Sequence, residues 1–136
     1  MHTIPNVPDS LSREIYAALC SNLPTPSPDT PAARAAREER ALTFLATLVP
    51  ENSAEAELAV QTVAADVHSK DCLRAASRPG LDPDQQRRCR AQAATMMRAM
   101  QTGVRLLQRT QALRENAEAA RPPRNARVKG PVAQLV

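Results

Sequence analysis

Hydrophobic and polar positions recur with a helical period along residues 84–121, a stretch without internal proline. An apolar side chain returns every three or four positions, which places these side chains on one side of a helix. Arginines recur about two positions out of phase, and two positions correspond to nearly the opposite side. We therefore predict one long helix with two faces. Its apolar stripe consists of Cys89, Ala93, Met96, Met100, Val104 and Leu107, and its arginine row consists of Arg87, Arg90, Arg98, Arg105 and Arg109.

Capping residues and prolines predict three shorter helices before this long one. Ser10, Thr30 and Asn52 are suitable N-cap residues, and Glu55 completes a capping-box pattern with Asn52. The four prolines of segment 24–31 exclude a helix there, so we expect an extended linker. The predicted helices run from Ser10 to about Asn22, from Pro31 to about Leu48 and from Ser53 to about Ala76.

These elements predict an all-α protein built on a long antiparallel helical hairpin over residues 53–120. The turn at Pro79 and Gly80 is short, so the two helices that it joins should lie side by side. We expect one or two shorter helices to pack alongside. The predicted divisions are residues 1–31 (N-terminal tail, short helix and proline-rich linker), 32–120 (helical domain) and 121–136 (basic disordered tail).

Three polar regions are expected to be exposed to solvent. Residues 32–40 form the polar first half of the second helix. Glu51, Glu55 and Glu57 lie at a helix N-terminus, where the helix dipole favours negative charge, and they are expected to form a solvated first turn. Residues 108–120 end the long helix with few large apolar side chains. This end is predicted to extend past the shorter third helix, into solvent or against the second helix or a partner chain.

The composition predicts a thin hydrophobic core. Leu, Ile, Val and Phe together account for 25 of the 136 residues, and alanine takes the place of the missing aliphatic side chains. Alanine is the best helix former, but it contributes little free energy on burial. Association with another chain is the natural remedy, so we expect a homo-oligomer or a protein partner.

Charge is divided unevenly between the two halves of the chain. Residues 1–69 carry 4 basic and 9 acidic side chains, whereas residues 70–136 carry 14 basic and 5 acidic ones. The net charge of +9 in the second half suggests a polyanionic partner, although the acidic half can also neutralise it inside the fold or a dimer. Sixteen of the 18 basic residues are arginine, which a GC-rich genome alone can produce.

The chemically active residue types do not assemble into a catalytic or metal-binding pattern. His68, Cys72 and Cys89 would lie together across the hairpin, but a tetrahedral metal site needs a fourth ligand that the sequence does not supply. Close helix packing is the simpler interpretation of both cysteines. With three scattered glycines and two histidines, the chain offers neither a phosphate-binding loop nor a catalytic triad. We therefore expect no enzyme activity, no cofactor and no bound metal.

The leading functional hypothesis from the sequence is a non-catalytic protein–protein interaction or assembly module that self-associates. The apolar stripe of the long helix would carry this interaction at Met96, Met100, Val104 and Leu107. Helices that present such a stripe commonly bury it against another helix.

The alternative hypothesis is an accessory protein that binds duplex nucleic acid through the arginine row and the basic tail. Arginines along one helix face can follow phosphates without reading the base sequence. The predicted hairpin places Asp71 near Arg90 and Glu57 near Arg105, and such pairs would neutralise part of the row. The tail would add Arg121, Arg124, Arg127 and Lys129.

The sequence does not suggest a membrane protein. No apolar run approaches the ~20 residues that a spanning helix needs. Residues 1–8 also lack the basic and apolar regions of a signal peptide. We therefore expect a cytoplasmic protein with reduced cysteines.

Overall fold

The computed structural model describes residue 4 and residues 7–124. Within these residues the chain forms four α-helices and no strand. The helices are α1 (Asp9–Asn22), α2 (Pro31–Thr47), α3 (Ser53–Ala76) and α4 (Pro83–Ala119). The all-α prediction is confirmed, and each helix boundary lies within two residues of the predicted one.

The helix starts follow from their capping residues, with one exception. The Thr30 hydroxyl accepts a hydrogen bond from the Ala33 amide at 3.1 Å, and the Asn52 side chain accepts one from the Glu55 amide at 2.9 Å. The predicted cap at Ser10 is wrong, because α1 already begins at Asp9 and its N-cap position, Pro8, has no side-chain cap. Asp9 instead places a negative charge in the first turn, where the helix dipole favours it.

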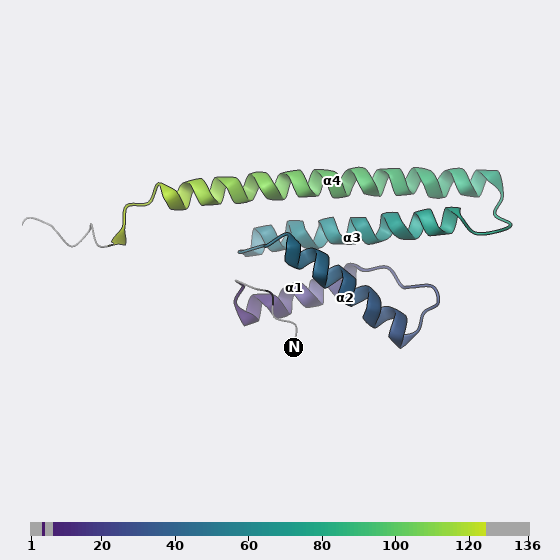
Figure 1. The fold of residues 1–136 in the computed structure, drawn as a ribbon, viewed down its shortest axis with the longest axis horizontal. Helices are drawn as coiled ribbons and strands as arrows, with labels where there is room; N and C mark the ends of the chain where they lie inside the picture. Colours follow the sequence, from purple (N-terminus) through teal and green to yellow (C-terminus); the bar gives the residue numbers. More distant parts are fainter. Residues whose placement is uncertain (1–3, 5–6, 125–136) are drawn as a thin grey trace, which may run out of the picture.

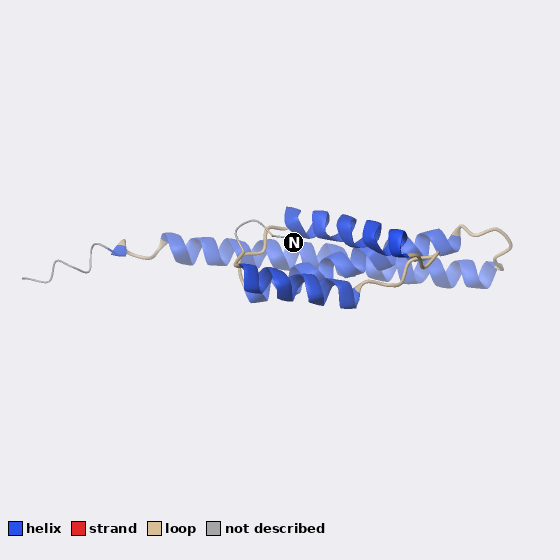
Figure 2. Ribbon diagram, turned by 90° about the horizontal axis from the view of Figure 1, so that it is seen from below, coloured by secondary structure: helices blue, strands red, loops and turns tan. Residues whose placement is uncertain are grey.

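Helix α3 lies at the centre of the molecule, with α4 along one side and α1 and α2 on the other (Figure 1). Seen from below, α1 and α2 lie next to each other in front of α3 and α4 (Figure 2). Helix α4 packs against α3 and against neither α1 nor α2 within the described chain. One side of α4 is therefore buried, and the opposite side of this long helix has no neighbour in the structure.

The larger apolar residues gather between α3 and the two N-terminal helices. Leu19 of α1, Leu45 of α2 and Val63 of α3 are each 0% exposed. Ile15 and Val60 complete the centre of this cluster. Fully burying such aliphatic side chains stabilises the fold by roughly 1.5–3 kcal/mol each, so this cluster is the main apolar core.

Small residues form the second interface, between α3 and α4. Ala59, Thr62 and Ser69 of α3 and Ala93 of α4 are all buried there. Gly103 of α4 is so close to α3 that an added Cβ atom would lie 2.2 Å from the Thr62 Oγ1. The two helices therefore pack at very short distance, which lets an alanine-rich chain bury area without large side chains.

The described helices include none that combines the length and the apolar content of a bilayer-spanning segment.

Candidate functional site

The apolar stripe of α4 faces α3. Leu107 and Ala93 are each only 1% exposed. The other members of the stripe, Cys89, Met96, Met100 and Val104, are partly buried. Because α3 is the helix against which α4 packs, the surface predicted for a partner chain is in large part occupied within the chain itself.

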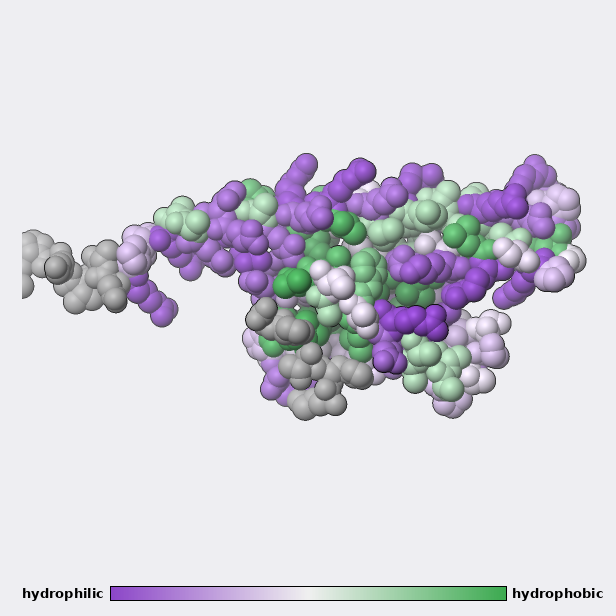
Figure 3. Space-filling model, viewed as in Figure 1, coloured by the Kyte–Doolittle hydropathy of each residue, from purple (hydrophilic) through white to green (hydrophobic). Residues whose placement is uncertain are grey.

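The arginine row lies on the side of α4 that faces away from α3. All five of its members are exposed: Arg87, Arg90, Arg98, Arg105 and Arg109. At 1.5 Å rise per residue, the row extends for about 33 Å from its first arginine to its last. Hydrophilic side chains accordingly project from the upper edge of the molecule, where α4 lies (Figure 3).

Most of the arginine row has no acidic partner. Arg87 pairs with Asp84, one turn before it on the same helix. Within the described part of the chain, no ion pair is made by the other four members, Arg90, Arg98, Arg105 and Arg109. From residue 85 to residue 113, α4 carries six arginines and no acidic residue. The outer side of α4 therefore carries four arginines whose positive charge has no acidic partner in the described chain.

The two predicted pairings between α3 and the arginine row are wrong. Asp71 binds Arg37 of α2 at 2.7 Å and Arg74 of its own helix instead of Arg90. Glu57 is exposed and makes no ion pair with Arg105. The reason is geometric: the row points away from α3, so acidic side chains of α3 do not reach it.

Only the first part of the basic tail after α4 lies within the described residues. Arg121 and Arg124 are exposed at the end of the described chain. Arg127 and Lys129, which were also predicted to bind a polyanion, lie outside the described residues. Glu115 and Glu118 separate these two arginines from the arginine row.

The acidic turn at the start of α3 is only partly solvated, because Glu51 and Glu57 are exposed as predicted but Glu55 is 0% exposed. Its carboxylate accepts hydrogen bonds from the Arg114 Nε at 3.0 Å and the Arg114 Nη2 at 3.3 Å. The Asn52 side-chain amide donates to the same carboxylate, and Glu51 binds the Arg114 Nη1 at 2.8 Å. These carboxylates, Glu55 first, raise the pKa of Arg114 above its usual value.

The end of α4 was expected in solvent, against the second helix or against a partner chain, and its residues 111–114 contact the end of α2 and the start of α3. Besides Arg114, the Gln111 amide donates to the carbonyl oxygens of Leu48 and Val49 at 2.8 and 3.1 Å. Helix α4 is therefore anchored to the α2–α3 turn as far as residue 114. The sequence contained one signal for this anchor: Arg114 lies seven positions after Leu107 and so falls on the apolar side of α4.

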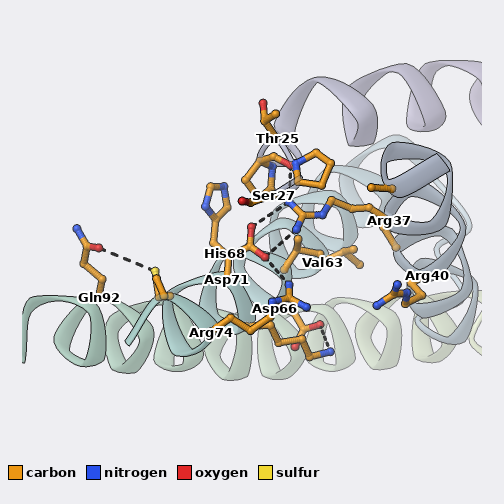
Figure 4. Close-up of a pocket in the computed structure, with 18 of the residues that line it drawn as sticks. Thr25, Ser27, Arg37, Arg40, Val63, Asp66, His68, Asp71, Arg74 and Gln92 are labelled. Atoms are coloured by element: carbon orange, nitrogen blue, oxygen red, sulfur yellow. Dashed lines mark hydrogen bonds and ion pairs between the residues drawn. The ribbon is translucent and has the colours of Figure 1, made fainter. Parts of the chain in front are cut away.

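Arg37 of α2 is a second largely buried arginine, after Arg114. The sequence did not predict it, because the first half of α2 was expected to be exposed. Arg37 is only 12% exposed and donates to both carboxylate oxygens of Asp71, at 2.7 and 2.9 Å. Its Nη1 also donates to the Pro24 carbonyl oxygen at 2.5 Å. Arg37 thus ties the proline-rich segment and α2 to α3, beside a cleft that these elements enclose (Figure 4).

Two of the three cysteines lie at this cleft. Cys72 and Cys89 both border the cleft as free thiols, and the Cys72 thiol lies 3.9 Å from the Gln92 Oε1. Burial, helped by Cys89 and Asp71, raises the pKa of Cys72, which keeps the thiol protonated and a poor nucleophile. Among the described residues, no group of three His, Cys, Asp or Glu side chains is placed to hold a metal ion.

Comparison of the chain with family models, curated proteins and solved structures finds no significant match.

Proposed function

We propose that this chain is a non-catalytic binding protein that holds double-stranded nucleic acid along the outer side of α4. The observation that carries the proposal is the uncompensated arginine row. Six arginines and no acidic residue occur between residues 85 and 113, and four of the five row members have no acidic partner in the described chain. If α3 neutralised the row, as the sequence also allowed, there would be little charge left to offer a ligand.

The physical basis is the high negative charge density of a duplex. Each phosphate that an arginine neutralises releases condensed counterions, and this release drives binding without base recognition. Arginine also forms paired hydrogen bonds with phosphate oxygens. Helix α4 is held against α3 over the stretch that carries the row, so the backbone that presents these arginines needs little ordering on binding.

A duplex fits this surface better than a single strand. Single strands are usually held by aromatic side chains on which the bases stack. The chain has no Trp, and its one Tyr and one Phe lie on α1 and α2, away from the arginine row. The surface thus offers phosphate contacts but no stacking platform.

The test is binding of the intact chain to a short random-sequence duplex at about 50 and 200 mM salt. With four to six phosphate contacts, affinity should fall by about 10²–10³ between these conditions. Arg98→Glu with Arg105→Glu should abolish binding at the lower salt while the helical circular dichroism is unchanged. The matched control is Arg13→Glu with Arg34→Glu, which makes the same change in net charge on exposed parts of α1 and α2. If both double variants bind equally well, the arginine row is not the binding surface.

A second candidate, association of two copies, is favoured by the exposed leucines of α4. Leu106 and Leu113 are 45% and 65% exposed and lie seven positions apart on one side of the helix. In a two-fold contact, Leu106 of one copy would meet Leu113 of the other, so a single patch would be self-complementary. In this arrangement α3 and α4 act as an antiparallel hairpin that presents the patch.

Light scattering tests this second candidate. Leu106→Glu with Leu113→Glu should convert a dimer to a monomer without loss of helicity. These positions are better probes than Met100, which is partly buried on the side that faces α3. A wild-type chain that is monomeric at high concentration would exclude the contact.

A further inference from the structure

The proline-rich segment, α2 and α3 enclose a cleft that the proposed duplex-binding surface does not use. Its volume is about 830 Å³, within the range of roughly 300–1,000 Å³ that small-molecule sites occupy. Thr25 and Ser27 border it on one side, α2 and α3 form its main walls, and Cys89 and Gln92 of α4 lie at its edge (Figure 4). The arginine row, by contrast, lies on the side of α4 that faces away from α3.

The walls of the cleft are held in place before any ligand binds. Arg37 joins the Pro24 carbonyl oxygen to Asp71, through bonds of 2.5 Å on one side and 2.7 and 2.9 Å on the other. This arginine is largely buried, and both of its terminal nitrogens donate hydrogen bonds. It therefore fixes the proline-rich segment against α3. A preformed cleft needs little ordering when a ligand enters.

The cleft has an excess of positive charge after its internal pairs are counted. Five basic residues and two acidic residues line it. Asp66 is taken by Lys70 at 2.8 Å, and Asp71 is taken by Arg37 and Arg74. Both acidic groups are therefore already neutralised. The remaining two arginines, Arg40 and Arg78, make no ion pair within the described chain.

Apolar side chains form another part of the same wall. Phe44 of α2 and Val67 of α3 line the cleft and are partly exposed, whereas Ala41 and Val63 lie behind them and are buried. An inorganic anion would leave these side chains without contacts. A ligand with an anionic group and an organic body would use both parts of the cleft.

We propose that this cleft binds a small phosphate ester of about nucleotide size, with its phosphate held by Arg40, Arg78 and their basic neighbours. Arginine suits this group because its planar guanidinium can form two hydrogen bonds to one phosphate. The organic body would lie against Phe44 and Val67. This site is separate from the arginine row and does not depend on duplex binding.

The experiment is calorimetric titration of the intact chain with AMP and, separately, with inorganic phosphate. AMP should bind more tightly than inorganic phosphate, because only AMP can contact the apolar wall. Equal affinity for the two probes, or no heat from AMP at millimolar concentration, would overturn the proposal.

Two matched pairs of substitutions locate the site. Arg40→Gln with Arg78→Gln should weaken AMP binding by at least about tenfold, because two charge-assisted hydrogen-bonding groups are lost. The same pair should leave duplex affinity nearly unchanged. Arg98→Gln with Arg105→Gln should have the reverse effect. All four arginines are exposed, so folding should be retained in both variants.

The outcomes separate the two proposals. Loss of AMP binding in both double variants would mean that AMP binds as a general anion, and this cleft would be excluded. Loss of duplex binding in the Arg40 and Arg78 variant would make the cleft part of the duplex surface and overturn its separate role. A chain that binds AMP but no duplex would leave the cleft supported and exclude the proposed function of α4.

Discussion

At the scale of single residues, Gly103 determines how closely α4 approaches α3. Thr62, its neighbour on α3, is 2% exposed and donates its hydroxyl hydrogen to the Leu58 carbonyl oxygen at 2.6 Å. A Cβ atom at position 103 would lie too close not only to the Thr62 Oγ1 but also to the Thr62 Cβ, at 3.2 Å. Rotation of the hydroxyl alone therefore does not make room for a methyl group.

We expect Gly103→Ala to destabilise the protein. In an unconstrained helix this change would stabilise by up to ~1 kcal/mol, but overpacking of a tight interface costs ~1–3 kcal/mol. Urea unfolding should show a lower free energy of unfolding for Gly103→Ala than for the wild type. Adding Thr62→Ala to the same chain should restore part of that free energy. Thr102→Ala, at an exposed position of α4, is the control and should be neutral or slightly stabilising. A gain in stability from Gly103→Ala would show that the two helices are further apart.

Tyr16 supplies a pH-dependent probe at the same scale. Its hydroxyl donates to the Glu38 Oε2 at 2.9 Å, and chiefly this hydrogen bond raises the pKa of Tyr16 to about 12 from 10.0. Between pH 10.0 and about pH 12, the Tyr16 hydroxyl keeps its proton in the folded chain but has lost it in the unfolded chain. The stabilising contribution is therefore complete below pH 10.0 and disappears as the pH rises to about 12.

Tyrosinate absorbance measures this shift directly, because the chain contains one tyrosine. We expect a titration midpoint near pH 12 in the folded chain and near 10.0 in denaturant. Glu38→Gln should move the folded midpoint toward the denatured value. Identical midpoints in both solvents would show that α1 and α2 are not joined by this hydrogen bond.

At the scale of helices, the contact between Arg114 and Glu55 anchors the second half of α4. The contact joins the last third of α4 to the first turn of α3, and Gln111 adds hydrogen bonds to the turn before α3. A buried carboxylate is costly unless it is paired. The arginine is therefore needed chiefly because Glu55 is buried.

Arg114→Met should lower the thermal midpoint much more than Arg109→Met, which removes an unpaired exposed arginine from the same helix. We expect a decrease of about 10 °C or more for Arg114→Met and of at most about 2 °C for Arg109→Met. The double change of Arg114→Met with Glu55→Met should recover part of the loss, since no unpaired charge then remains buried. Equal midpoints for the two single variants would show that the anchor does not form.

At the scale of the whole molecule, charge and packing are separated across α3. Most of the apolar core lies between α3 and the two N-terminal helices, and α4 adds Leu107 to it while its arginine row faces outward. The chain's net charge of +4 is thus unevenly placed, with exposed arginines along the outer side of α4, the edge from which hydrophilic side chains project in Figure 3. Such an arrangement favours a long anionic ligand that lies along the edge.

The salt dependence of duplex binding tests this arrangement residue by residue. Each of Arg98→Gln, Arg105→Gln and Arg109→Gln should reduce the slope of log affinity against log salt by about 0.9. Arg13→Gln, on the exposed side of α1, should leave the slope unchanged. A slope that is insensitive to all the α4 substitutions would place the phosphate contacts elsewhere.

The sequence by itself determined the four helices, because their signals are local. Prolines and the caps at Thr30 and Asn52 act within one turn, and the two faces of α4 follow from a period of 3.6 residues. The outward position of the arginine row was predictable on the same basis. Only the tertiary structure decided which charges meet. Consecutive side chains of a helix point about 100° apart, so the side chain that faces a neighbouring helix depends on how the two helices are rotated and aligned against each other. For that reason Asp71 joins Arg37 rather than Arg90, Glu55 is buried beneath Arg114, and the arginine row stays open.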